Sequence, residues 1–208
     1  MKKEILSRKE KERLFRRAAI MDAAVGIFAN KGYRDTTLNE IAITSEFGKG
    51  TIYNYFKSKE EIYFAIIDDV SKSLYQIIQQ ADSAANNSKD FFEIHMKLVF
   101  QYCVGKRDAF IIYVREIAHF TTDIFITDRK KINERNEQRR SILIKKISKG
   151  IKLRKFKKYD AKKLATLYEH LLFPYILFLI NTFKDNIDQD KEIDFILSVF
   201  YNGIINKK

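Results

Sequence analysis

The sequence is poor in the residues that interrupt helices. It contains one proline and seven glycines among 208 residues, and runs of alternating β-branched residues are scarce. Proline and glycine disfavour the interior of a helix more strongly than any other residues, and alternation is the mark of a half-buried strand. The composition therefore predicts an all-α fold, and a hydrophobic content of 46% is enough for a packed core.

Cysteine and long apolar runs are also scarce. The single cysteine, Cys103, excludes an intrachain disulfide framework and fits a reducing compartment. The first seventeen residues are charged throughout and lack the apolar stretch of a secretion signal. The strongest apolar run, residues 171–180, is about half of the ~20 residues that cross a bilayer. We therefore expect a cytoplasmic protein that has no membrane partner.

Residue patterns typical of enzymes are scarce as well. The three histidines, His95, His119 and His170, have no metal-ligand spacing beyond a weak His119/Asp123 pair four residues apart. Cys103 has no neighbouring signature of a nucleophile, and the sequence has no glycine-rich phosphate-binding loop. We therefore predict that the protein is not an enzyme and needs no metal or other cofactor.

Positive charge, in contrast, is in excess. The formal net charge is +12, which predicts a polyanionic partner such as nucleic acid, an anionic membrane surface or a phosphorylated ligand. Residues 129–163 carry 16 lysines and arginines against three acidic residues. The basic stretch 145–163 has three interpretations: a solvated helix end, a site for an acidic head group such as that of an acyl-coenzyme A, or an extra contact with nucleic acid or another anionic surface.

The N-terminal part of the sequence has the pattern of a helix-turn-helix. Apolar residues recur every three to four positions over residues 9–30, and Gly32 is suited to end that helix. Capping boxes at residues 37–40 and 58–61 open a short helix and a long one, and a second short helix is expected over residues 49–55. Two short helices joined by a tight turn, within four helices in all, are typical of a helix-turn-helix unit.

Residues 36–42 (TTLNEIA) and 48–60 (GKGTIYNYFKSKE) carry a more specific signal. In these residues the sequence resembles the TetR/AcrR family of transcriptional regulators, and the resemblance covers about residues 17–63. Its upstream part includes Ala23, Phe28, Gly32 and Tyr33. Beyond residue 65 it depends on length and helix number only.

The resemblance implies two domains. An N-terminal three-helix helix-turn-helix domain would occupy residues 1–60, and a C-terminal helical ligand-binding and dimerisation domain would occupy residues 61–208. No flexible linker separates them, so the boundary is expected inside the fourth helix. Five bulky amphipathic helices are expected after it, over residues 90–104, 107–125, 128–150, 160–183 and 189–205.

The helix that begins near Gly48 is the expected DNA reader. A helix N-terminus has unpaired amides and a partial positive charge, which attract phosphate. Lys49 can reach a guanine edge or a phosphate, and Asn54 can pair with adenine, while Lys59 would contact phosphates together with the Thr37 hydroxyl. The expected DNA-binding residues are Thr36, Thr37, Lys49, Gly50, Thr51, Tyr53, Asn54, Tyr55 and Lys59.

Two positions depart from the pattern of the family. The turn reads Ser45-Glu46-Phe47 where the family usually has a small residue and then glycine. A glutamate at positive φ costs roughly 1 kcal/mol relative to glycine, so the shape of the turn is in question. Gly48 stands where a serine often caps the recognition helix, and glycine caps only slightly less well.

The resemblance also implies a ligand cavity and a dimer in the C-terminal domain. The expected cavity residues are Phe92, His95, Met96, Phe100, Cys103, Phe110, Tyr113, His119, Phe120 and Phe173. The last two helices would pair with a second subunit in a four-helix bundle, and they carry apolar residues at helical spacing. The expected interface residues are Leu167, Leu171, Tyr175, Phe178, Ile196 and Phe200.

These features together predict a homodimeric repressor that a small hydrophobic or aromatic molecule releases from operator DNA. Its two recognition helices would enter successive major grooves, about 34–36 Å apart. Two alternatives remain open. One is a sequence-tolerant nucleic-acid binder, and the other is an acyl-CoA- or lipid-binding regulator that uses residues 145–163.

Overall fold

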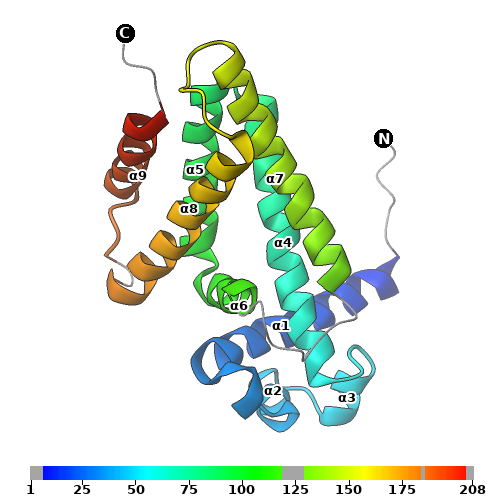
Figure 1. Cartoon of the computed structure of the whole chain (residues 1–208). Helices are drawn as coiled ribbons and strands as arrows, with labels where there is room; N and C mark the ends of the chain where they lie inside the picture. Colours follow the sequence, from blue (N-terminus) through cyan, green and yellow to red (C-terminus); the bar gives the residue numbers. More distant parts are fainter. Residues whose placement is uncertain (1–6, 119–128, 184–185, 205–208) are drawn as a thin grey trace.

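The computed structural model describes residues 7–118, 129–183 and 186–204, which form nine helices and no β-strand. The all-α prediction is therefore confirmed. The helices are α1 (Arg8–Asp35), α2 (Leu38–Thr44), α3 (Lys49–Tyr53), α4 (Lys59–Ala84), α5 (Ser88–Gly105), α6 (Arg107–Ala118), α7 (Arg129–Lys152), α8 (Ala161–Phe183) and α9 (Gln189–Ile204). Helices α1 to α3 lie at one end of the molecule, and α5 and α7 to α9 lie beyond α6 toward the other (Figure 1).

Local sequence signals determine the small N-terminal helices. The amide of Glu40 donates to the Thr37 hydroxyl at 3.2 Å, and the Glu40 carboxylate accepts from the Thr37 amide at 2.9 Å, which closes the predicted capping box. Gly32 interrupts α1 with φ of 80°. Glu46 is at φ of 58°, so this turn keeps the left-handed conformation although it lacks glycine. Gly48 caps α3 without a side-chain hydrogen bond.

The N-terminal core is small and fully apolar. Its central residues are Ile20, Phe28, Ile41, Ile52 and Phe56, each at most 1% exposed. They come from α1, α2, α3 and the residues between α3 and α4, so the short helices are held by packing rather than by their own length. The outward faces of α2 and α3 are left for solvent.

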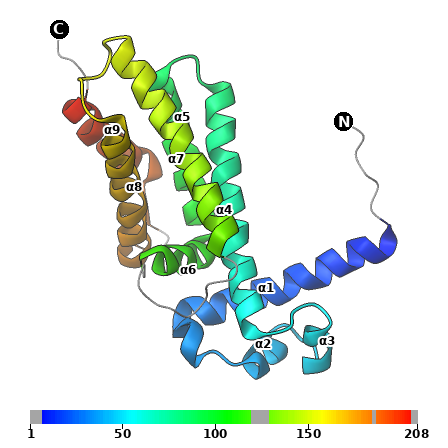
Figure 2. The same cartoon turned by 45° about the vertical axis from the view of Figure 1, so that its right-hand side comes forward.

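Helix α4 belongs to both parts of the molecule. Its first buried residue, Ile62, lies in the N-terminal core, and Leu74, Ile78 and Ala81 lie fully buried between the long helices of the larger part. Figures 1 and 2 show it running without a break from the level of α3 upward, with α7 beside it. The domain boundary expected inside this helix is therefore not marked by any linker.

The larger part consists of helices that pack on one another in layers. Helices α4, α5, α7 and α8 pack side by side, α6 crosses below them, and α9 packs against α5 and α8 (Figure 2). Four large side chains form its centre: Phe92 lies 5.0 Å from Tyr168 and 5.2 Å from Phe200 between ring centroids, and Phe156 lies 6.2 Å from Phe92. Pro174 lies inside α8, as the sequence indicates.

By length and composition alone, α8 could cross a membrane. In the structure, however, α8 carries the buried Glu169, whose carboxylate pairs with Arg139 and Arg140 of α7. Buried residues of α8 pack against α5, α6, α7 and α9. We therefore interpret α8 as a core helix of the larger part of the molecule.

The connection between α7 and α8 is fastened by one aromatic residue. Phe156 is 2% exposed and packs directly on Gly150 of α7. A Cβ atom on Gly150 would overlap Cδ2 of Phe156, because the two atoms would lie closer than non-bonded carbon atoms do in proteins. The position therefore requires glycine although it lies within a helix.

Replacement of Gly150 by alanine is expected to destabilise the protein. The added methyl group must displace a buried ring, and overpacking of this kind lowers the free energy of unfolding by about 1–3 kcal/mol. Gly26→Ala in α1 is the matched control, because nothing lies within 4 Å of its Cβ position, and it should stabilise by about 0.5–1 kcal/mol. Urea denaturation followed by circular dichroism measures both; a Gly150→Ala protein as stable as the parent would contradict this account.

Candidate functional site

The first turn of α3 is presented to solvent. Lys49 and Gly50 are exposed, and Tyr53 is 55% exposed, although Ile52 between them is buried. Asn54, at the C-terminal cap, is exposed too, whereas Thr51 and Tyr55 are half-buried. Seven of the nine residues predicted to read DNA therefore have side chains or backbone at the surface: Thr37, Lys49, Gly50, Thr51, Tyr53, Asn54 and Tyr55.

Thr36 and Lys59 have structural roles instead. Thr36 is 1% exposed, and its hydroxyl donates to the Gly32 carbonyl at 2.7 Å. The Lys59 ammonium donates to the carbonyls of Thr36 (2.6 Å), Tyr33 (2.7 Å) and Arg34 (3.2 Å), which uses its three protons. These contacts count against Thr36 as a DNA-binding residue and against Lys59 as a phosphate contact, because α1 and the loop after it already occupy both groups.

Charged side chains fix α2 beside α1. Lys31 of α1 pairs with the Glu40 carboxylate. That hydrogen bond, together with those from the amide and hydroxyl of Thr37, lowers the pKa of Glu40 to about 2. Arg17 donates to the Tyr55 carbonyl at 3.0 Å and lies over the Phe56 ring at 4.0 Å, so α1 also holds the end of α3. The helix-turn-helix is thereby presented as one rigid unit.

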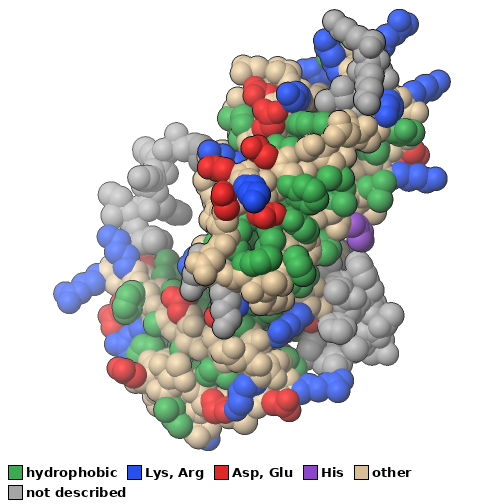
Figure 3. Space-filling view, turned by 90° about the vertical axis from the view of Figure 1, so that its left-hand side faces the viewer, with side chains coloured by type: hydrophobic (Ala, Val, Ile, Leu, Met, Phe, Trp, Pro, Cys, Tyr) green, Lys and Arg blue, Asp and Glu red, His purple; other side chains and the backbone are tan. Residues whose placement is uncertain are grey.

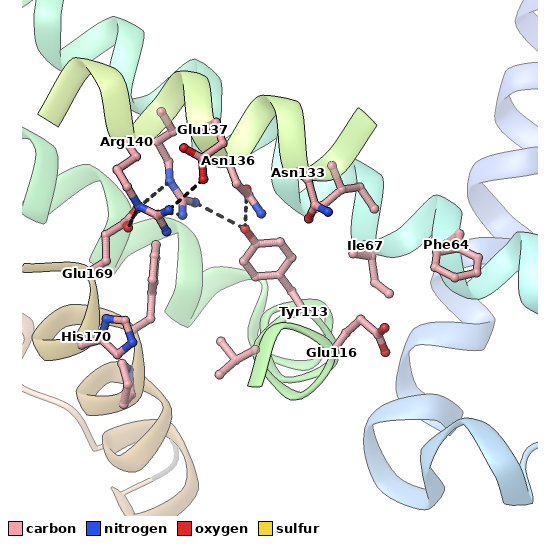
Figure 4. A pocket seen from close by; sticks show the side chains of 15 residues that line it. Phe64, Ile67, Tyr113, Glu116, Asn133, Asn136, Glu137, Arg140, Glu169 and His170 are labelled. Atoms are coloured by element: carbon pink, nitrogen blue, oxygen red, sulfur yellow. Dashed lines mark hydrogen bonds and ion pairs between the residues drawn. The ribbon is translucent and has the colours of Figure 1, made fainter. Parts of the chain in front are cut away.

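A cavity of about 520 Å³ lies in the larger part of the molecule, between α4, α6, α7 and α8 (Figure 4). This volume is in the range of small-molecule sites. Its walls are Phe64, Ile67, Tyr113, Val114, Glu116, Ile132, Asn133, Asn136, Glu137, Arg139, Arg140, Glu169, His170, Phe173 and Pro174.

Polar groups on one side of the cavity form a connected network. Arg139 donates to Glu169 at 3.0 Å and to the Tyr113 hydroxyl at 3.4 Å, and Tyr113 donates to Asn136 at 3.0 Å. Arg140 pairs with the second oxygen of Glu169 at 2.9 Å. Figure 4 shows this network on the α7 side, with Tyr113 pointing from α6 toward Asn136.

The central ion pair of this network is buried. Arg139 is 5% exposed and Glu169 is 6% exposed. Burial alone would lower the pKa of Arg139, but the opposing effects of Tyr113 and Glu169 outweigh it and raise that pKa. The guanidinium also lies 4.9 Å from the centre of the Phe173 ring. A charge in this position is tolerated only because its partners are in place.

Two of the ten predicted cavity residues, Tyr113 and Phe173, line the cavity. His119 and Phe120 lie outside the described residues. The other six are buried in the core between the helices and are absent from the cavity wall, which corrects their prediction as cavity residues: Phe92, His95, Met96, Phe100, Cys103 and Phe110. Five of them lie on α5, which contributes no residue to the wall, whereas Phe110 lies on α6, whose wall residues are Tyr113, Val114 and Glu116.

The sequence analysis missed the contribution of α7. Ile132, Asn133, Asn136, Arg139 and Arg140 lie three to four residues apart and form one face of that helix toward the cavity. This spacing is present in the sequence. Because the helix is rich in charged residues, however, no cavity residue was predicted on it. The basic stretch 145–163, by contrast, contributes none of the cavity's lining residues.

A second polar contact is buried outside the cavity. Nδ1 of His95 is hydrogen-bonded to the Tyr168 hydroxyl at 2.9 Å. The imidazole ring also stacks on the ring of Phe91. Burial, assisted by the positive charge of Arg139, lowers the pKa of His95 to about 3. This histidine is therefore neutral in the folded protein at physiological pH.

The outer face of α8 and α9 is apolar and exposed (Figure 3). Leu167, Leu171 and Phe178 were predicted there and are 39–56% exposed, while Tyr175 is half-buried and donates to Glu192 at 2.6 Å. Ile196 and Phe200 were wrong, since they are 5% and 4% exposed and pack inside the subunit. The large apolar residues of α9 that are exposed are Phe195 and Val199.

Known transcriptional regulators are similar to this chain in sequence. Residues 20–66 match the model of the bacterial regulatory proteins of the tetR family. The chain is 29% identical to the uncharacterized HTH-type transcriptional regulator YhgD of Bacillus subtilis, over 85% of this chain and 89% of that protein. It is 25% identical to the fatty acid metabolism regulator protein of the same organism, over 90% and 95%.

Solved structures have the same fold. The ketosteroid transcriptional regulator KstR2 of Mycobacterium tuberculosis superposes with a TM-score of 0.79 at 18% identity, over 92% of this chain and 96% of that one. FadR from Bacillus subtilis, solved in complex with stearoyl-CoA, superposes with a TM-score of 0.73 at 21% identity, over 89% and 98%. At these identities the likeness concerns the fold alone.

The low pKa of His95 predicts an acid-sensitive fold. The unfolded chain binds a proton near pH 6.5 and the folded chain only near pH 3, so between these values the unfolded state holds more protons and stability falls as pH falls. We expect His95 to lower the free energy of unfolding by about 2 kcal/mol between pH 7 and pH 5. In His95→Gln this slope should shrink; His170→Gln, at an exposed site, should leave it unchanged.

Urea titrations of the three proteins at several pH values measure the slope. The slope, rather than the absolute stability, is the decisive quantity, because His95→Gln also alters the contact with Tyr168. Equal slopes in the parent and in His95→Gln would show that His95 does not titrate in this way.

Proposed function

Because this chain belongs to the TetR family of transcriptional regulators, we propose that it is a homodimeric repressor. It binds operator DNA through α3 and is released when a small hydrophobic or aromatic molecule fills the cavity. The observation that carries this proposal is the course of α4: the helix begins six residues after the end of α3, and its residues Phe64 and Ile67 line the cavity. We expect a cytoplasmic location, as for a regulator that acts on DNA.

The exposed groups of α3 suit a major groove. Lys49 and the free amides at the start of α3 favour phosphate or a guanine edge. Gly50 lets the backbone approach closely, and Thr51 and Asn54 offer contacts to bases. We expect Tyr53 and Tyr55 to contact the DNA backbone, which sets register rather than sequence preference. The Thr37 hydroxyl, also predicted there, donates to the Glu40 carboxylate and accepts from the Glu40 amide as a helix cap.

The apolar face of α8 and α9 supports a dimer. Phe178 and Phe195 are 53% and 54% exposed, and Leu167, Leu171 and Val199 continue the same face. A patch of this kind on a free subunit is unfavourable in water, and a two-fold axis would bury it against its own copy. A dimer would also supply the second α3 that a palindromic operator requires.

One hydrogen bond connects α6, a wall of the cavity, with α1, and one ion pair connects α7, another wall, with α4. Arg115 of α6 donates to the Ala29 carbonyl of α1 at 2.7 Å, directly beside the cavity residues Val114 and Glu116. Arg135 of α7 pairs with Asp68 of α4 at 2.7 Å. A ligand that shifts α6 or α7 would therefore move α1 and α4, and with them the distance between the two α3 helices of the dimer.

The cavity favours a ligand without strong negative charge. Both of its arginines already pair with Glu169, and Glu116 and Glu137 add further carboxylates to the walls. The aromatic walls Phe64, Tyr113 and Phe173 favour an apolar or aromatic body. Asn133 and Asn136 provide amide groups that can orient a hydroxyl or carbonyl.

An acyl-CoA is the second candidate effector. It is favoured by the similarity to the fatty acid metabolism regulator protein and to FadR with its stearoyl-CoA. An acyl chain would suit the apolar walls, but the head group would have to lie outside the described cavity. None of residues 145–163 lines the cavity, so the cavity itself adds no support for a head-group site in that stretch.

A footprint on the DNA that flanks the gene, with and without effectors, tests the function. We expect a near-palindromic protected site, and loss of about 100-fold or more in affinity for the double variant Lys49→Ala, Tyr53→Ala, because each base or backbone contact contributes about 1–3 kcal/mol. Lys97→Ala, Tyr159→Ala is the matched control: it also removes one exposed lysine and one exposed tyrosine. Equal protection by both variants would refute DNA reading by α3.

The effector arm compares a fatty alcohol, the carboxylic acid and the CoA thioester of one chain length. The true effector should weaken operator binding about 5–150-fold, and operator DNA must weaken effector binding by the same factor. Arg115→Ala should reduce this coupling while the effector still binds. Tight effector binding with unchanged operator affinity would contradict the proposed release.

The dimer is tested by the double variant Phe178→Asp, Phe195→Asp. Two buried carboxylates in an apolar interface are strongly unfavourable, so sedimentation equilibrium should give the monomer mass of 24.6 kDa where the parent gives twice that mass. Phe15→Asp is the control, since Phe15 is 73% exposed and belongs to α1, a helix that lies at the other end of the molecule from α9 (Figure 2). A double variant that remains dimeric would place the interface elsewhere.

A further inference from the structure

The basic stretch 145–163 forms one surface in the structure, here called the basic crown. It comprises the end of α7, the connection to α8 and the first turn of α8. Only one acidic residue, Asp160, lies within it, and its carboxylate accepts the amides of Lys162 and Lys163 at 2.8 and 2.9 Å, which caps α8. The exposed basic residues of the crown are Lys145, Lys149, Lys152, Arg154, Lys155, Lys158, Lys162 and Lys163.

The crown is a built surface rather than a loose loop. Phe156 is buried on Gly150, and the amides of Lys155 and Phe156 both donate to the Gly150 carbonyl, at 2.9 and 3.2 Å. Lys157 is turned inward: its amide donates to the Ile204 carbonyl at 2.6 Å and its ammonium to Gly203 at 3.1 Å. The remaining cations are therefore held outward in a fixed arrangement.

Two large apolar side chains protrude among these cations. Leu153 is 58% exposed and Tyr159 is 52% exposed, one on each side of the buried Phe156. This connection therefore buries Phe156 and leaves Leu153 and Tyr159 exposed to solvent. An apolar side chain surrounded by lysines is a combination that a bilayer interface accommodates, because the lysines reach the head groups while the apolar groups enter the acyl boundary.

The crown lies at the end of the molecule opposite to α3 (Figures 1 and 2). Helix α4, which spans much of this separation, has 26 residues and is therefore about 39 Å long. A duplex that contacts α3 cannot reach the crown. If a two-fold axis brings both α3 helices to one side of a duplex, it brings both crowns together on the far side.

We propose that the basic crown docks on the surface of an anionic lipid bilayer. This inference goes beyond the regulator function and departs from the expectation of no membrane partner, although the net charge of +12 also fits an anionic membrane surface. Seven of the eight exposed cations are lysines, compact charges that suit a diffuse anionic surface rather than the bidentate recognition for which arginine is suited. Nucleic acid would satisfy the charges but would leave Leu153 and Tyr159 without an apolar environment.

Vesicle co-sedimentation tests this proposal. The full-length parent should partition at least tenfold more onto phosphatidylcholine vesicles with about one third phosphatidylglycerol than onto pure phosphatidylcholine, because each lysine near such a surface contributes roughly fivefold. The preference should fall steeply as salt is raised to about 0.5 M, where exposed charges are screened.

Matched variants separate the crown from net charge. Lys152→Glu, Lys158→Glu should reduce binding to the anionic vesicles at least tenfold, whereas Lys97→Glu, Lys106→Glu, with the same change in net charge at exposed sites of α5 and its end, should change it less than threefold. Leu153→Ser, Tyr159→Ser should weaken binding at high salt, while Phe15→Ser should not. A far-ultraviolet circular dichroism spectrum and a urea midpoint equal to those of the parent verify that each variant is folded.

Three outcomes would overturn the proposal. The first is equal binding to anionic and neutral vesicles, and the second is equal loss in the crown variant and its charge-matched control. The third is binding of a random duplex that the crown variant alone loses, without vesicle binding by the parent, which would assign the crown to nucleic acid. Each result is independent of whether α3 reads an operator.

Discussion

Helix α4 is the constraint on which the rest of the structure depends, because it is buried in both hydrophobic cores. Ile62 lies in the N-terminal core and Leu74 in the core of the larger part, with no break in the helix between them. A helix that is packed at both ends cannot be displaced at one end without moving the other, since close-packed interiors resist local deformation. The small domain therefore needs no linker, and its orientation is set by the larger one.

The buried pair of Arg139 and Glu169 gives the cavity its chemical character. Taking two charges out of water costs several kcal/mol per ion, and their attraction offsets this only when further hydrogen bonds complete them. Here Tyr113 and Arg140 supply those bonds. The pair joins α7 to α8, so the wall of the cavity and the helix that carries the apolar outer face are fixed to each other by the same contact.

The sequence predicted the N-terminal part well because its signals are local. A capping box needs only residues three positions apart, as with Thr37 and Glu40. The shape of the turn after α2 was left in question because it lacks glycine, and the structure puts Glu46 there at positive φ. In the larger part, the same reasoning predicted the helices but chose the wrong outward face for α9. Phe195 and Ile196 are adjacent, yet one is 54% exposed and the other 5%.

That failure has a physical reason. Helix α9 is apolar on two sides, so periodicity identifies a helix but not which side meets the subunit core. The cavity poses the same problem, because Phe92 and Tyr113 are both fully buried aromatic residues, and only the packing of four helices decides that Tyr113 borders an empty space. The packing of the helices decides which side of each helix meets the core, the cavity or solvent. A local stretch of sequence does not contain that information.

The positive charge of the chain is divided between regions that act separately. The two arginines of the cavity pair with Glu169 and Glu137, whereas Lys49 of α3 and the eight outer cations of the basic crown are exposed. Charges at these two ends are separated by about the length of α4, roughly 39 Å, which is several times the Debye length of about 8 Å at physiological salt. Neither end therefore weakens the other, and the chain can hold two polyanionic surfaces at once without repulsion between the groups that bind them.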